Sequence, residues 1–141
     1  MNNLRWVFTR ANAFLYQISN GRFGSRVGKQ SVLLLHTIGR KSGKPYTTPL
    51  SYYRDGENYL IVASNWGKEY PPDWFRNLFH QSRATIQVKN TTLEVKAHRA
   101  EGEEYQRLWD AVTLKNTQYL DYQKSIKRRI PIVILTPISK N

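Results

Sequence analysis

Cysteine is absent from this chain of 141 residues, and long apolar runs are scarce. Without thiols there can be no disulfide framework, thiolate zinc site, iron–sulfur cluster or cysteine nucleophile. The longest apolar run, from Ile130 to Leu135, is far shorter than the roughly 20 residues that span a bilayer. Arg5 and Arg10 interrupt the apolar residues at the N-terminus, which therefore lack the continuous apolar segment of a signal peptide. We therefore expect a cytoplasmic protein.

Acidic side chains are missing from residues 1–54, because Asp55 is the first carboxylate in the sequence. The same stretch holds nine Lys and Arg residues, so it carries most of the net charge of +12. Such an asymmetry predicts an anionic partner. Composition alone leaves three classes open: a nucleic acid, a membrane surface, and a phosphorylated or carboxylated ligand.

The rest of the composition describes one folded domain. The chain is 40% hydrophobic and 13% aromatic, and its length is near the commonest domain size. We find no repeat and no shift in composition, so we expect a single domain over residues 1–141. Residues 1–24 are expected to form a basic amphipathic helix over 4–19, followed by a basic connection. Such a helix can pack on the core, close a ligand pocket or lie on an anionic membrane.

Short apolar segments with the period of strands follow this helix. The sequence predicts six strands, over residues 31–37, 47–53, 58–63, 85–89, 92–100 and 130–136, and two more helices over 73–81 and 101–116. Asp55-Gly56 lies between the second and third strands and is a strong hairpin signal. The first three strands have no crossover long enough for parallel pairing. We therefore expect an α+β fold that is mainly β, a small antiparallel barrel of about six strands with N-terminal, middle and C-terminal helices.

A basic loop follows the first predicted strand, from Gly39 to Pro45. Its spacing is not that of a Walker A motif. The loop nevertheless offers backbone N–H groups, the Ser42 hydroxyl and three cations, Arg40, Lys41 and Lys44, which can surround a phosphate with charge-assisted hydrogen bonds. A solvated basic turn explains the same composition, so both interpretations stay open.

Several other chemistries find little support. His36, His80 and His98 do not stand at metal-ligand spacing, so we expect structural histidines and no metal site. Ser64 is not in the G-x-S-x-G turn of serine hydrolases, and no paired carboxylates are evident.

Aromatic side chains gather in two places. One group surrounds an irregular segment and comprises Trp66, Tyr70, Trp74 and Phe75. The other is Tyr119 and Tyr122, whose spacing places both phenols on one face of a helical turn. Such rings can stack on a flat ligand or donate a proton, although aromatics at the edge of a core show the same pattern. Together with the basic loop they favour a planar anionic cofactor.

Six segments form one ordered pattern over roughly residues 25–137. They are residues 37–45 with Pro49-Leu50 after them, 62–65, 72–78, 100–109, 119–123 and 129–131. This order and spacing resembles the deazaflavin-dependent nitroreductase family, small split β-barrel oxidoreductases that use coenzyme F-420. Two departures stand out. Tyr46 replaces an arginine that usually follows the loop proline, and Asn116 stands where one branch can place a further tyrosine.

The resemblance implies a role for particular residues. The cofactor-binding residues would be Arg40, Lys41, Ser42, Gly43, Lys44, Pro49, Ala63, Ser64, Asn65, Lys68, Trp74 and Asn77. Among these, the basic loop would hold the phosphate and the oligoglutamate tail, and residues 63–65 would lie along the deazaflavin. Tyr119 and Tyr122 would be the catalytic residues on the substrate side.

The expected function is transfer of hydride from reduced coenzyme F-420 to an electron-poor acceptor, such as a quinone, an enone or a nitroaromatic. One alternative is a split barrel that binds FMN. Another is a module that binds nucleic acid or a membrane surface, although we expect no nucleic-acid partner. A contact between the N-terminal helix and the inner face of the membrane stays open, as does the choice between a monomer and a homodimer.

Overall fold

Strands are the commonest regular structure in the computed structural model, which describes residues 16, 26–27 and 30–138. The strands are β1 (Arg26–Val27), β2 (Gln30–Ile38), β3 (Pro45–Asp55), β4 (Asn58–Val62), β5 (Arg83–Val88), β6 (Thr91–Arg99) and β7 (Ile132–Pro137). The helices are α3 (Asp73–His80), α4 (Gly102–Lys115) and α5 (Gln118–Ser125), with a 3-10 turn, η1 (Asn65–Gly67). The helix predicted over residues 4–19 lies outside the described residues, apart from Tyr16.

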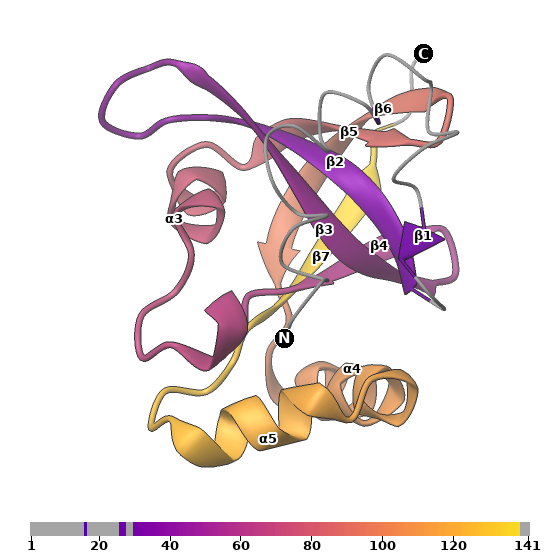
Figure 1. Ribbon diagram of the computed structural model, residues 1–141. Coiled ribbons are helices and arrows are strands. Elements are labelled where there is room, and N and C mark those ends of the chain that lie inside the picture. Colours follow the sequence, from indigo (N-terminus) through magenta and orange to yellow (C-terminus); the bar gives the residue numbers. More distant parts are fainter. Residues whose placement is uncertain (1–15, 17–25, 28–29, 139–141) are drawn as a thin grey trace.

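The strands form one antiparallel sheet that closes on itself (Figure 1). Their order is β1-β2-β3-β4-β7-β6-β5, and β2 also pairs with β5, so six strands complete a barrel. Leu34 in β2 illustrates the closure, because it lies opposite Pro49 of β3 and opposite Gln87 of β5. The predicted antiparallel barrel is thus confirmed, and the short β1 adds a seventh strand outside the ring.

Tight turns join neighbouring strands where the sequence indicated them. Asp55 and Asn58 are paired at the end of the β3–β4 hairpin, and Gly56 has a φ of 60°. This left-handed conformation is easy for glycine and explains the strength of the Asp-Gly signal. The strands differ from the predicted ones by a few residues at their ends, since β2 and β3 continue toward the basic loop as far as Ile38 and Pro45.

Two large apolar clusters hold the fold together, one on each face of the strands that they share, and a third, small cluster contains Tyr16, Val32 and Leu34. Leu60 and Val62 of β4 belong to the cluster that includes α4 and α5, whereas Ile61 belongs to the cluster that includes α3. Successive side chains of a strand point to opposite faces, so β4 is apolar on both. Helices therefore cover the barrel on two sides, with α3 apart from α4 and α5 (Figure 1).

The region after α4 is more regular than predicted. The sequence indicated a helical turn at Tyr119 and Tyr122, and the structure has a separate helix, α5. The break falls at Asn116, whose backbone is extended (φ −143°, ψ 95°) and whose Oδ1 accepts a hydrogen bond from the Gln118 N–H at 3.1 Å. This bond satisfies a donor at the start of α5, the usual task of a capping residue. Within the described ranges, no helix is long and apolar enough to cross a bilayer.

Candidate active site

A cavity of about 240 Å³ lies between the barrel, the η1 turn and α5. It is lined by Gln30, Thr48, Pro49, Leu50, Ser51, Val62, Ser64, Asn65, Trp66, Pro72, Trp74, Asn116, Gln118, Tyr119 and Tyr122. One wall comes from β3, another from the backbone after β4, and a third from α5. Apolar and aromatic surfaces with polar groups at their edges are typical of a pocket for a flat organic molecule.

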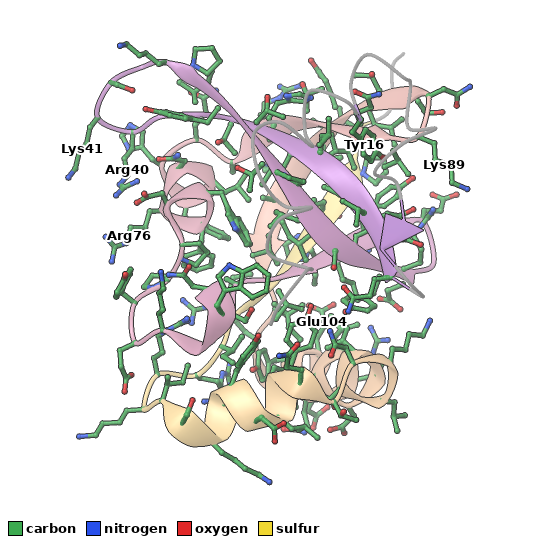
Figure 2. The ribbon with its side chains drawn as sticks, viewed as in Figure 1. Tyr16, Arg40, Lys41, Arg76, Lys89 and Glu104 are labelled. Atoms are coloured by element: carbon green, nitrogen blue, oxygen red, sulfur yellow. The ribbon has the colours of Figure 1, made fainter. Side chains whose placement is uncertain are left out.

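A second hollow of about 310 Å³ lies at the basic loop. It is lined by Gly39, Arg40, Lys41, Ser42, Tyr46, Asp73 and Asn77. The helix α3 contributes to both sites, since Trp74 lines the cavity and Asn77 lines the hollow. In Figure 2, Arg40 and Lys41 lie beside Arg76 on the same side of the molecule, around the loop and α3. This side of the molecule is therefore suited to an anion.

The basic loop is fixed to α3 through Arg40. The Arg40 backbone N–H donates to Asn77 Oδ1 at 3.1 Å, and Arg40 Nη1 donates to the same oxygen at 2.9 Å. Arg40 Nη2 also lies 3.3 Å from Asp73 Oδ1. The Asn77 side chain is buried and the Asp73 carboxylate is largely exposed, so the bonds to Asn77 are the stronger constraint.

The loop itself is compact. The Gly43 N–H donates to Gly39 O at 2.9 Å, and the Lys44 N–H donates to Ser42 Oγ at 3.2 Å. A Cβ on Gly39 would lie 2.7 Å from the Tyr46 ring, so this position has room only for glycine while the ring stays there. Tyr46 thus lies over the loop where the related pattern has an arginine.

The turn after β4 has an unusual backbone. Asn65, Trp66 and Gly67 all have positive φ, at 48°, 58° and 80°. The turn is closed by two hydrogen bonds, from Gly67 N–H to Ser64 O at 3.0 Å and from Lys68 N–H to Asn65 O at 3.1 Å. Positive φ is uncommon for residues other than glycine and is frequent where a backbone is shaped for function.

Tyr119 is almost fully buried, with 7% of its surface exposed. The Tyr53 hydroxyl donates to the Tyr119 oxygen at 3.1 Å, and the two rings meet edge to face. Burial raises the pKa of Tyr119 well above its usual value, and the neighbouring Tyr53 adds to the shift. Tyr119 therefore keeps its proton over the physiological range and can act as a hydrogen-bond donor.

Tyr122 is half-buried and packs against the turn after β4. A Cβ on Gly67 would lie 2.8 Å from Tyr122 Cδ1, so the backbone of the turn and this ring are in direct contact. Trp66 lines the same cavity. The shape of the η1 turn and the position of the ring are therefore linked.

The structure divides the predicted site residues into three groups. The cavity is lined by Pro49, Ser64, Asn65, Trp74, Tyr119 and Tyr122. The hollow is lined by Arg40, Lys41, Ser42 and Asn77. Gly43, Lys44, Ala63 and Lys68 line neither. Ala63 is buried with its N–H bonded to Pro131 O at 3.0 Å, whereas Gly43, Lys44 and Lys68 are exposed nearby.

Sequence reasoning missed several residues of the cavity, among them Gln30, Thr48, Ser51 and Gln118. It also missed Arg128, which donates hydrogen bonds to the turn after β4. The adjacent Arg129-Ile130-Pro131 was part of the ordered pattern, and this is the one signal that lay near it. No cluster of three or more potential metal ligands occurs in the described part of the chain.

Known proteins are similar to this chain over most of its length. The model of a family described as F420H(2)-dependent quinone reductase matches residues 7–137. A Mycobacterium tuberculosis protein named F420H(2)-dependent quinone reductase is 40% identical over 131 residues, which cover 90% of this chain and 88% of that protein.

Two solved structures are similar in fold. One, described as an F420-H2 dependent reductase (FDR-A), has a TM-score of 0.68 and 30% identity, and covers 74% of this chain and 92% of its own. The other, described as a domain-swapped dimer, has a TM-score of 0.71 and 28% identity, and covers 95% of this chain and 99% of its own.

Proposed function

Since this chain belongs to the F420H(2)-dependent quinone reductase family, we propose that it transfers hydride from reduced coenzyme F-420 to a quinone. The observation that carries the proposal is the pair of sites joined by α3, a cavity with apolar and aromatic walls beside a basic hollow. A flat ring system with an anionic tail needs both. Membership of this family supports the expected oxidoreductase activity and the expected cofactor. It also supports a quinone as the acceptor over a nitroaromatic or an enone.

The residues present fit such a cofactor. Trp74 and Pro49 give the cavity flat apolar walls, and Ser64 and Asn65 bring polar atoms to its edge. The hollow supplies the Arg40 guanidinium, already oriented by Asn77, together with Lys41 and Ser42. Guanidinium and ammonium groups beside backbone N–H donors are the usual partners of phosphate and carboxylate.

We assign the parts of the cofactor accordingly. Arg40, Lys41, Ser42 and Gly43 would hold the phosphate, while the exposed Lys44 and Lys68 would meet the carboxylates of the tail. The backbone of Ala63, Ser64 and Asn65, the Pro49 ring, Trp74 and Asn77 would border the ring system and its linkage.

Tyr119 and Tyr122 are the residues that we assign to the reaction. When bound, the reduced deazaflavin supplies a hydride. The quinone then needs one proton on oxygen to become a hydroquinone, and the Tyr122 hydroxyl or a water molecule delivers it. Tyr119, which retains its proton, donates a hydrogen bond to the acceptor oxygen and stabilises the negative charge that develops there. Side-chain nucleophiles play no part in this scheme.

The two alternatives from the sequence are not favoured. The matching family and the M. tuberculosis relative are both named for F420H(2) rather than for FMN. A module that binds nucleic acid or lipid would not need a cavity of this kind next to its basic loop.

Contact with the inner face of the membrane stays a prediction, since residues 1–24 lie outside the described part of the chain apart from Tyr16. The choice between monomer and homodimer is likewise open to measurement, for example by analytical ultracentrifugation. A similar structure is described as a domain-swapped dimer, which makes that measurement informative.

One experiment tests the proposal. The protein is titrated separately with coenzyme F-420 and with FMN, and binding is read from the quenching of each cofactor's fluorescence. Reduced coenzyme F-420 is then mixed with a soluble quinone without oxygen, and its reoxidation is followed by absorbance. We expect tighter binding of the deazaflavin and protein-dependent reoxidation. Tighter binding of FMN, or reoxidation at the rate of the protein-free mixture, would refute the proposal.

A further inference from the structure

Arg128 lies just beyond α5, and its guanidinium reaches the turn that follows β4. Nη1 donates to Ala63 O at 3.2 Å, Nη2 donates to Ser64 O at 2.9 Å, and Nε donates to Lys68 O at 2.9 Å. These are normal hydrogen-bond lengths. One side chain therefore binds three carbonyls at both ends of the turn, about sixty residues earlier in the sequence.

The turn needs such support, because its backbone is strained. Asn65 and Trp66 have positive φ, which costs free energy in residues with a Cβ and persists only where the surroundings enforce it. Within the segment, the Gly67 and Lys68 amides and the Asn65 side chain, which donates to Tyr70 O at 2.9 Å, contribute hydrogen bonds. The planar guanidinium has its donors in a fixed fork, so it can set the positions of several carbonyls at once.

The backbone around Arg128 is in turn fixed to α5 and to the end of the turn. Gln123 Nε2 donates to Arg128 O at 2.8 Å, and the Ile130 N–H donates to Gln123 Oε1 at 2.8 Å. The Lys127 N–H donates to the Glu69 carboxylate at 3.1 Å. Arg128 is thus built into a segment whose position depends on both α5 and the turn.

These two elements form facing parts of the cavity. The turn contributes Ser64, Asn65 and Trp66, and α5 contributes Tyr119 and Tyr122. Gly67 lies so close to the Tyr122 ring that the turn and α5 are in direct contact there. A change in the turn therefore moves one side of the cavity relative to the other.

We propose that Arg128 is a positioning residue that sets the distance between the turn at residues 64–66 and the tyrosines of α5. The inference rests on the proposed function, in which the cofactor ring lies against the turn and the acceptor lies against α5. Arg128 lines neither the cavity nor the hollow, so it acts through the backbone that it binds and not by contact with a reactant.

Geometry rather than charge is the property that this role requires. Lysine keeps the positive charge but offers a single ammonium, which cannot reach three carbonyls in the same arrangement. Arg128→Lys should therefore resemble Arg128→Gln. The matched control is Arg129→Gln, which removes the same charge from the next residue, whose guanidinium lies 3.7 Å from the centre of the Tyr105 ring.

The first test needs no cofactor. Amide hydrogen exchange is measured over residues 63–70 in the unliganded protein, the two Arg128 variants and the Arg129 control. We expect the Gly67 and Lys68 amides to exchange about 10-fold faster in both Arg128 variants, because their bonds belong to a turn that opens locally. The β2 and β3 amides should keep their protection, which shows that the barrel is folded. Unchanged exchange at Gly67 and Lys68, or an equal change in the Arg129 control, would overturn the proposal.

The second test measures single-turnover hydride transfer to a quinone together with the Kd of the cofactor. We expect the Arg128 variants to lose about 10- to 100-fold in the transfer rate, since a misplacement of about 1 Å is enough for such a loss. Their Kd should change much less. In an Arg128→Ala variant, low millimolar guanidinium should restore part of the rate, and ammonium should not.

The outcomes separate the two proposals. A wild-type rate for Arg128→Lys, or equal rescue by both cations, would refute the positioning role. If the wild-type protein shows no transfer at all, the proposed function is wrong, and the exchange measurement still decides whether Arg128 holds the turn.

Discussion

Asn77 Oδ1 accepts two hydrogen bonds from Arg40, one from its backbone N–H and one from its guanidinium. One buried amide thus fixes both the path of the basic loop and the direction of its arginine. The hollow is already shaped before any anion enters, and binding need not order the loop. Such preorganisation removes part of the entropic cost of binding.

Replacement of Asn77 by Ala should weaken cofactor binding and stability together. The Arg40 N–H loses its acceptor, and leaving such a group without a partner costs about 1–3 kcal/mol. We expect a loss of that size in urea unfolding and a Kd for coenzyme F-420 that rises about 10-fold, in keeping with 1.4 kcal/mol per decade. The control is Asp73→Asn, which removes only an exposed ion pair and should leave stability within about 0.5 kcal/mol. Unchanged affinity in Asn77→Ala would show that the loop is oriented by other contacts.

Lys41 is exposed at the hollow, and its charge should contribute to affinity without contributing to the fold. Lys41→Gln should raise the cofactor Kd several-fold and reduce the dependence of that Kd on salt, because one fewer cation faces the anionic tail. Lys89→Gln removes the same charge on the opposite side of the molecule and should have little effect (Figure 2). Equal effects of the two variants would indicate that only the overall charge matters.

Tyr122→Phe should lower the rate of quinone reduction more than the affinity for the cofactor. Loss of one hydroxyl that donates a proton is expected to cost about 10²-fold in kcat if no water replaces it. Cofactor titration and steady-state kinetics on the same preparation give both numbers. The exposed Tyr70 provides the control variant Tyr70→Phe. A kcat that stays at the wild-type value would assign proton delivery to water.

Gly67 and Gly56 allow a backbone effect to be separated from a contact effect. Both have positive φ, so replacement by Ala should destabilise each by roughly 1–2 kcal/mol. Only Gly67→Ala also places a methyl group against Tyr122, because nothing lies within 4 Å of a Cβ on Gly56. We therefore expect Gly67→Ala to lose at least as much stability in urea unfolding as Gly56→Ala, and quinone turnover to fall for Gly67→Ala alone. A comparable fall in Gly56→Ala would show that turnover follows stability.

Stability should decrease in alkaline solution because of Tyr119. Burial raises its pKa in the folded state above the unfolded value, so the folded form holds the proton more tightly. The stabilisation is complete below the unfolded pKa of about 10 and is lost as pH rises through the folded pKa, by at most about 1.4 kcal/mol per pH unit for one group. Urea unfolding between pH 9 and 11 measures this slope. Tyr119→Phe should make the slope shallower than Tyr70→Phe does, and equal slopes would contradict the expectation.

Local patterns account for most of the fold. Apolar runs such as the one at Leu33 mark strands that are buried on both faces, and Asp55-Gly56 marks a turn with a definite backbone requirement. These strands and this turn depend on residues close together in the sequence, which is why they could be predicted. That the basic loop and the two tyrosines serve one cofactor came instead from the resemblance to a known family, and it stays a prediction.

The remaining features depend on partners far apart in the chain. Neither the bonds between Arg40 and Asn77 nor those between Arg128 and the turn leave a trace in periodicity or composition. The closure of the barrel through β2 and β5 is of the same kind, since strand patterns do not specify which edges meet. Asn116 is an example from neighbouring residues. Its Oδ1 accepts a hydrogen bond from the Gln118 N–H and separates α4 from α5, but only because the Asn116 backbone is extended there.

The helix α3 sets the spacing between the cavity and the hollow. Trp74 and Asn77 are three residues apart and lie on one face of the helix, and each belongs to a different site. One residue inserted between them would turn the second side chain by about 100° and carry it away from Arg40. The basic loop meets this helix through Arg40, so the spacing of Trp74 and Asn77 sets the separation of the two sites. We therefore expect related chains to conserve that spacing.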